Sequence, residues 1–411
     1  MCRFSPSRGL QPGLLLFSAF FGLCASAADG VWTRHTIDRS SRGADGVRLG
    51  DVDRDGRLDI VTGWEEGGRV RVYLQPPASA LRRTWPAVTV GEVRSPEDAV
   101  FVDVDGDGAV DVVSSCEGRE RTMFIHWAPS ARERFLDAKA WKTDAIPVTR
   151  NARSWMFTLP MDVDGRHGID LVTGSKGGGA VVGWLEAPAT PRSVAGWKHH
   201  VLRPAGWIMS IRTVDLDADE DPDILVSDRR GERAGVFWLE NPGVDAVRRG
   251  AKWTEHAVGE DLGEVMFLDT GDLDGDGRRD IVCAVKGRGI AYLRATGVRA
   301  SPWSVHRVAL PPGCGTAKAV AIGDVDVDGR RDIVFSCEGA KGERSGMRWM
   351  SFDGSATSGR WRDHEIGGPE GVKFDRIELV DLDGDGDPDV VSCEERDNLG
   401  VFWYENPTRG G

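Results

Sequence analysis

The stretch GDLDGDGRRDIV, Gly271 to Val282, places four aspartates around a glycine directly before an apolar run. Carboxylates a few Å apart repel one another, and burying them without a counter-charge costs still more free energy. Four carboxylates and a backbone carbonyl supply the all-oxygen ligand set that Ca²⁺ prefers, and the glycine permits the sharp turn that gathers them. The pattern D-x-D-x-D-G-x-x-D therefore predicts a calcium loop with the ligands Asp272, Asp274, Asp276 and Asp280.

An EF-hand loop begins in the same way but ends differently. It requires a glutamate at its twelfth position and a helix after it. The twelfth position here is Cys283, inside the β-branched segment DIVCAV. The sequence therefore excludes an EF-hand and indicates an acidic loop that leads into a strand.

Acidic loops of this kind occur seven times along the chain. Their first aspartates are separated by 52 to 59 residues, a period typical of a repeat fold rather than of independent domains. Five loops keep all four acids and the glycine, and we expect each to bind one calcium ion. Besides the loop from Asp272, their ligands would be Asp51, Asp53, Asp55 and Asp59; Asp103, Asp105, Asp107 and Asp111; Asp324, Asp326, Asp328 and Asp332; and Asp381, Asp383, Asp385 and Asp389.

Two loops depart from the pattern. The fourth has Glu220 in place of the glycine, and we expect a sixth, strained calcium site there, formed by Asp215, Asp217, Asp219 and Asp223. The third loop starts at Asp162, but it has Arg166 at the middle ligand position and His167 at the glycine position. A cation at a ligand position opposes metal binding, so the third loop is predicted to hold no calcium.

Four short strands per repeat must position these loops. A mixed apolar segment precedes each loop, a β-branched run such as DIVTG or DVVSS follows it, an aromatic segment comes next, and W-x-x-H or a relative comes last. Seven units of four strands predict an all-β fold, a seven-bladed β-propeller, which protects its sheet edges by closing into a ring. We expect the recurrent Trp and His residues to be structural, packing one blade against the next.

The two ends of the chain indicate how the ring closes. The repeats begin with an isolated fourth strand, VWTRHTI, and end with a third strand, VFWYENP. We therefore expect the N-terminal strand to complete the last blade, within one domain that spans residues 28–411.

The first 27 residues resemble a secretory signal peptide. Two arginines precede the apolar run LLLFSAFFGLC, and the small residues ASA follow it. Eleven apolar residues are too few to span a bilayer comfortably, so we expect cleavage after Ala27, secretion, and no membrane span. The chain has a formal charge of -13, much of it in the acidic loops, which argues against nucleic acid as a partner.

These features together resemble the FG-GAP and VCBS repeat proteins, whose propellers include the head of integrin α-subunits and many secreted bacterial proteins. The resemblance covers residues 30 to 407 and rests on seven copies of the acidic loop. It implies calcium in the loop between the first and second strands of each blade. It does not by itself imply one function, because the same architecture hosts adhesion modules, lectins, lyases and dehydratases.

The face of the ring opposite the acidic loops is where we expect function, because the connections there vary from blade to blade. Six residues after the last loop aspartate, three consecutive repeats carry a base and the other four carry an acid: Lys176, Arg229 and Lys286, then Glu338, Glu395, Glu65 and Glu117. Three tryptophans outside the repeated motifs map to the same face. The candidate ligand-binding residues are Trp64, Arg153, Trp155, Trp207, Lys176, Arg229 and Lys286.

Two classes of function fit this face. Rings and cations suit an acidic sugar or a polypeptide segment, so the first hypothesis is a binding module for carbohydrate or protein. The alternative is a polysaccharide lyase or sugar dehydratase, which needs a positioned acid and base. Histidine and tyrosine are confined to the repeated strands and the third loop, which leaves lysines and the acidic group for catalysis or for a second metal. The sequence favours the binding module.

Overall fold

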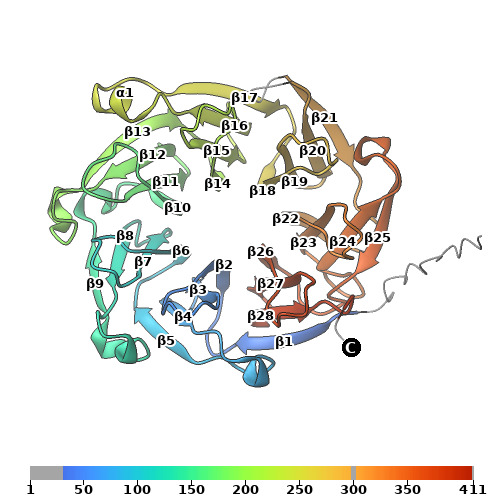
Figure 1. The fold of residues 1–411 in the computed structure, drawn as a ribbon, viewed down its shortest axis with the longest axis horizontal. Helices are drawn as coiled ribbons and strands as arrows, with labels where there is room; N and C mark the ends of the chain where they lie inside the picture. The colour runs from blue at the N-terminus through green and yellow to red at the C-terminus, as the bar shows by residue number, and fades with distance from the viewer. Residues whose placement is uncertain (1–30, 298–301, 410–411) are drawn as a thin grey trace, which may run out of the picture.

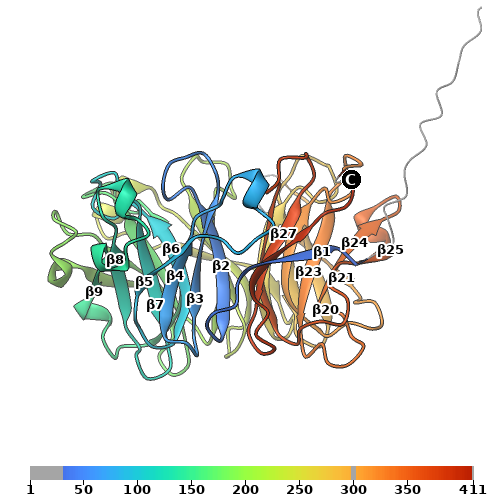
Figure 2. The same ribbon diagram turned by 90° about the horizontal axis from the view of Figure 1, so that it is seen from below.

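The computed structural model describes residues 31–297 and 302–409. Its 28 strands form seven four-stranded antiparallel sheets around a central axis, a seven-bladed β-propeller (Figure 1). Seen from the side, the blades form a flattened ring, and the connections between strands lie at its two faces (Figure 2). The predicted fold class is confirmed, and the predicted signal peptide, residues 1–27, lies outside the described residues.

Each blade consists of four strands, which follow one another outward from the axis in sequence order in blades 1 to 6, while in blade 7 the outermost strand is β1. Blades 1 to 4 comprise β2 to β5 (Ala44–Gly50, Asp59–Trp64, Arg69–Tyr73, Ala87–Gly91), β6 to β9 (Pro96–Val102, Asp111–Cys116, Met123–Trp127, Lys142–Ala145), β10 to β13 (Ser154–Met161, Asp170–Lys176, Val181–Glu186, Lys198–Pro204) and β14 to β17 (Ile208–Val214, Asp223–Asp228, Gly235–Glu240, Thr254–Glu260). Blades 5 to 7 comprise β18 to β21 (Val265–Gly271, Asp280–Val285, Gly289–Ala295, Trp303–Val308), β22 to β25 (Thr316–Gly323, Asp332–Glu338, Met347–Phe352, Trp361–Glu365) and β26 to β28 (Phe374–Val380, Asp389–Glu394, Gly400–Glu405) with β1 (Thr33–Asp38).

The N-terminal strand closes the ring as the sequence predicts. β1 pairs antiparallel with β28, from Thr33 opposite Glu405 to Asp38 opposite Val401. First and last repeats therefore share blade 7, and the ring cannot open without breaking this pairing.

The second strand of each blade lies between two neighbouring blades. β3, β7, β15 and β19 are buried along their whole length, which explains why each has consecutive apolar residues after its first aspartate rather than a strict apolar–polar alternation. Between blades 1 and 7, for example, Trp64 packs in one cluster with Val391 and Trp403.

The recurrent histidines pack within their own blades. His200 stacks on Trp184 with ring centroids 4.5 Å apart, and its Nε2 lies 2.8 Å from the Glu186 carboxylate on the adjacent strand. His256 and Trp238 repeat this arrangement at 4.3 Å. The motif is structural, as predicted, but each pair joins the third strand to the fourth strand of one blade instead of joining two blades.

Over residues 31–297 and 302–409, helical structure is limited to connections. The longest helix is α1, Val244–Arg248, between β16 and β17, and the rest are single 3₁₀ turns: Ala78–Ala80, Arg132–Arg134, Ala138–Ala140, Pro147–Thr149, Val194–Gly196 and Ala356–Ser358. Within the described ranges, no helix has the length and apolar content needed to cross a bilayer.

Candidate functional site

The connection between the first and second strands of each blade is the acidic loop, and all seven lie on one face of the ring. We call them the Asp loops and their face the Asp-loop face. Every second strand begins at the last aspartate of its loop. In blade 2 this residue is Asp111, whose carboxylate accepts hydrogen bonds from the backbone N–H of Val104, 3.2 Å away, and of Ala128, 2.7 Å away. The carboxylate thus fastens the loop to the end of the third strand.

The first aspartate of each loop organises the turn. In six loops one of its oxygens accepts a hydrogen bond from the backbone N–H of the sixth loop residue, at 2.9 to 3.2 Å. That sixth residue is glycine in five loops and Glu220 in the fourth, where φ is +76°. The fourth loop therefore closes the same turn as the intact loops, with a side chain in a backbone region that favours glycine.

The third loop differs from the other six. Asp162 accepts instead from the N–H of Gly165, 2.7 Å away, and the N–H of Arg166 donates to Asp164. Arg248, at the end of α1, donates to the carbonyls of Asp164 and Gly165 at 2.6 and 2.7 Å. Three acids still lie close together, but an arginine stands at the middle ligand position and a second arginine is bound to the loop.

The donor set of the other loops fits a hard divalent cation. One oxygen from each of Asp51, Asp53 and Asp59 lies within 4.8 Å of the others, and Asp103, Asp105 and Asp111 form the same group in blade 2. Two oxygens at that separation can both reach an ion about 2.4 Å away, which is the Ca²⁺–oxygen distance. Buried oxygens of Asp103, Asp217 and Asp385 accept no hydrogen bond, as expected for atoms that would face an ion.

Burial makes these carboxyl groups hard to ionise without a cation. It raises the pKa of the last aspartate to about 7 in blades 1 and 2 and to about 8 in blades 6 and 7. Arginines supply part of the missing positive charge: Arg192 pairs with Asp105 and Asp107, and Arg294 pairs with Asp274 and Asp276. The loops are therefore acidic sites whose charge the chain only partly balances.

On the opposite face, the charged ends of the second strands divide the ring into two sectors. Lys176 to Lys286 form a basic sector over blades 3 to 5, and the acids form the remainder. The sectors meet through ion pairs, Lys176 with Glu117 at one boundary and Lys286 with Glu338 at the other. Arg229, in the middle of the basic sector, pairs with Glu264 at 2.8 Å. The two sectors predicted from the sequence are thus joined by contacts between neighbouring blades.

Three cationic side chains lie against the ring of Trp207 in the basic sector. The Lys176 ammonium lies 4.7 Å from its ring centroid, and the guanidinium groups of Arg229 and Arg230 lie 4.5 and 5.0 Å from it. Cations repel one another, and the electron-rich face of the indole offsets part of that repulsion. Trp207 is half-buried, and its Nε1 is buried without a hydrogen-bond partner.

A pocket of about 680 Å³ opens beside this cluster, between blades 4 and 5. Its charged lining comprises four bases and three acids: Arg229, Arg230, Lys286, Arg288, Glu232, Asp261 and Glu264. The sequence singled out two of these residues and missed Arg230 and Arg288. Both lie in turns between second and third strands, in DRRGER and KGRG, where a cluster of bases was the available signal.

The other two tryptophans predicted for this face are core residues. Trp64 and Trp155 have 0% and 1% of their surface exposed, and their indole nitrogens donate to Tyr73 Oη and to the Thr149 carbonyl. Their rings offer no free surface for a ligand. Arg153 covers Trp155 at 5.9 Å and so belongs to this packing.

The channel is filled below the basic sector. Met156, Met209 and Met266 are buried, and Phe157 of blade 3 contacts Phe267 of blade 5 across the axis at 5.7 Å. Ligands of the basic sector would therefore rest on the face and would not pass through the ring.

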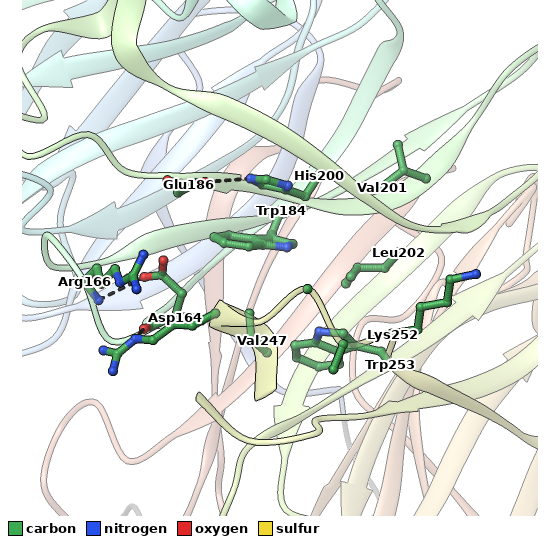
Figure 3. A pocket seen from close by; sticks show the side chains of 13 residues that line it. Asp164, Arg166, Trp184, Glu186, His200, Val201, Leu202, Val247, Lys252 and Trp253 are labelled. Carbon is green, nitrogen blue, oxygen red and sulfur yellow. Dashed lines mark hydrogen bonds and ion pairs between the residues drawn. The ribbon is translucent and has the colours of Figure 1, made fainter. Parts of the chain in front are cut away.

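A second pocket, of about 610 Å³, lies on the outer part of the Asp-loop face between blades 3 and 4 (Figure 3). Trp184 and Trp253 face it from two blades with Val247 of α1 between them, and Arg166 of the third loop lies at its edge. This pocket was not predicted from the sequence. It forms where the connection of blade 4 that contains α1 contacts blade 3, and this contact has no counterpart at a repeated position.

Comparison with known proteins agrees with this architecture. The FG-GAP-like repeat family matches residues 51–114 and 235–335. No curated protein sequence matches the chain. Two crystal structures of BBS1N in complex with ARL6DN, one soaked with mercury and one with lead, are similar in fold at a TM-score of 0.50, with 10% and 11% identity. They cover 92% and 93% of this chain and 99% of their own, so the similarity extends over the whole ring. The matched repeats and the seven four-stranded blades support an FG-GAP/VCBS repeat β-propeller.

Proposed function

We propose that this propeller is a secreted, calcium-stabilised binding module that recognises an acidic carbohydrate on the face opposite the Asp loops. The fold by itself suggests a binding or recognition module. The observation that carries the finer proposal is the group of three cations around Trp207, at the edge of a pocket large enough for a few sugar residues.

Calcium is assigned to six Asp loops. The five intact loops and the fourth share the same turn, and their carboxylate oxygens suit a hard cation of about 2.4 Å ligand distance. The third loop is left without an ion because Arg166 stands where a ligand would be and Arg248 binds its carbonyls. When bound, each ion would neutralise buried carboxylates and hold the first strand of a blade to the second.

The ligand class follows from the balance of charge near Trp207. Lys176, Arg229 and Arg230 face three carboxylates, Glu97, Glu117 and Glu264, while the pocket beside them is lined by four bases and three acids and so keeps a surplus of positive charge. Arg230 is half-exposed and 3.4 Å from Glu264, so it is the cation most easily shared with a ligand. Carboxylate or sulfate groups on a sugar would accept hydrogen bonds from these guanidinium groups.

Binding to immobilised polysaccharides tests the proposal. Uronate-rich and sulfated polymers should bind and neutral ones should not, and the affinity should fall with added salt. Exchanging both Arg230 and Arg288 for alanine should weaken binding at least about tenfold, or about 1.4 kcal/mol. The matched control is Arg249→Ala, which removes an exposed arginine after α1, far from this pocket.

Four outcomes would contradict the proposal. Equal binding by the double variant would move the site elsewhere, and loss of binding on exchange of Trp253 instead would move it to the pocket of Figure 3. Unsaturated products released from an acidic polysaccharide would instead identify a lyase. Failure to bind any polysaccharide while binding a protein would assign the face to protein recognition.

A further inference from the structure

A second group of carboxylates lies away from the Asp loops, at the mouth of the channel on the opposite face. Asp45, Glu97 and Asp375 stand at the start of the innermost strands of blades 1, 2 and 7, while Glu65 and Glu395 follow the second strands of blades 1 and 7. One oxygen each from Asp45, Glu65 and Glu97 lies within 4.8 Å of the others, and so does one each from Asp45, Asp375 and Glu395. The two groups share Asp45, which joins them into one site.

Lysines balance only part of this charge. Lys318 pairs with Asp375 at 2.6 Å, Lys373 pairs with Glu395, and Lys176 reaches Glu97 only at 3.8 Å because it pairs closely with Glu117. Among the described residues, no lysine or arginine lies within ion-pair distance of Asp45 or Glu65. The channel mouth therefore holds more carboxylates than ammonium groups.

Two buried groups point to a missing partner. Asp45 is 7% exposed, and a carboxylate oxygen of another acid, Asp375, lies within 4.8 Å of one of its own. Asp375 is 1% exposed, and its Oδ1 accepts no hydrogen bond, although its Oδ2 is held by Lys318. A buried carboxylate oxygen without a donor costs several kcal/mol unless a cation or proton reaches it.

A proton would be the cheaper partner only in the absence of metal. A divalent ion removes the repulsion among three carboxylates at once, whereas each proton neutralises only one. The donor atoms are all oxygens, which selects Ca²⁺, Mg²⁺ or Mn²⁺ over softer metals.

We propose that Asp45, Glu65 and Glu97 bind one divalent cation at the channel mouth, with Asp375 and Glu395 beside it, separately from the Asp loops. The ion would lie on the ligand-facing side of the ring, next to Lys176, Lys318 and Lys373. It does not depend on the proposed carbohydrate site, and either assignment can fail without the other.

Metal content measured after dialysis against 1 mM CaCl₂ tests the site. The double variant Glu65→Gln/Glu97→Gln should retain one ion fewer per chain than the wild type. Glu338→Gln is the matched control, because Glu338 holds the same position in blade 6 but already pairs with Lys286. It should retain the full number, and Asp111→Asn should lose one ion from its own loop. An unchanged ion count in the double variant would overturn the proposal.

Wild-type crystals grown with Mn²⁺ provide a check that does not depend on the folding of the variant. An anomalous peak among the Asp45, Glu65 and Glu97 carboxylates supports the site. A map with peaks in the Asp loops and none at the channel mouth, or a bound amine there instead, refutes it.

Discussion

The two faces of the ring are built in different ways. On the Asp-loop face, one arrangement recurs in blade after blade: a first aspartate that closes the turn and a last aspartate that accepts backbone hydrogen bonds. On the opposite face, the equivalent positions carry a base in one blade and an acid in another, joined by ion pairs across blade boundaries. Repetition marks what holds the ring together, and variation marks where a ligand would be recognised.

Removing metal should have the largest effect, and it should act on the Asp-loop face. An ion that binds only the folded state adds about 2.7 kcal/mol when its concentration is 100 times its Kd, and six sites would contribute together. We expect excess chelator to lower the Tm in calorimetry by about 10 °C or more. A matched titration with Na⁺ at the same ionic strength controls for screening. An unchanged Tm in excess chelator would show that metal in the loops does not stabilise the fold.

Single substitutions in two loops should sharpen the contrast between metal-binding and metal-free loops. Asp111 and Asp170 each accept two backbone N–H groups in their blades, at 2.7 to 3.2 Å. In calcium, Asp111→Asn should cost about 3 kcal/mol, one ion plus one hydrogen bond, while Asp170→Asn should cost about 1 kcal/mol.

Chelator supplies the control for this pair of variants. Without metal, both should lose about 1 kcal/mol, because only the hydrogen bonds then differ from the wild type. Urea unfolding in calcium and in chelator measures all four values. Equal losses for both variants in calcium would mean that the third loop binds metal as the second does.

Acid should reveal a smaller effect that belongs to neither face. His126 is fully buried between Ser114 and Thr143 in blade 2, and burial lowers its pKa to about 3. The unfolded chain takes up a proton near pH 6.5 and the folded chain does not, so this contribution to stability is complete above pH 6.5 and is lost as pH falls towards 3. Between pH 7 and 5, in chelator, the wild type should lose about 2 kcal/mol more than His126→Gln. Parallel pH profiles for the two proteins would contradict this role.

The repeated face was the predictable one. The seven loops, the start of each second strand at a loop aspartate, and closure by the N-terminal strand follow from positions that recur with a fixed period. The fourth loop tolerates Glu220 at the glycine position because the backbone N–H of Glu220 still donates to Asp215.

The variable face was only partly predictable. The period placed Trp64, Trp155 and Trp207 near one face but could not say which rings turn inward between blades, and two of the three are buried. Arg230 joins the cations at Trp207 through contacts between connections, and such contacts have no counterpart in the other repeats. The carboxylates at the channel mouth also meet across blades, although the sequence raised a second metal there as one possibility.

Locating each ion tests the division between the two faces most directly. In an anomalous difference map from crystals grown with Mn²⁺, we expect peaks in the six loops that begin at Asp51, Asp103, Asp215, Asp272, Asp324 and Asp381, and none in the loop from Asp162. Asp loops without peaks in well-ordered crystals, or a peak in the third loop as strong as the rest, would contradict the account.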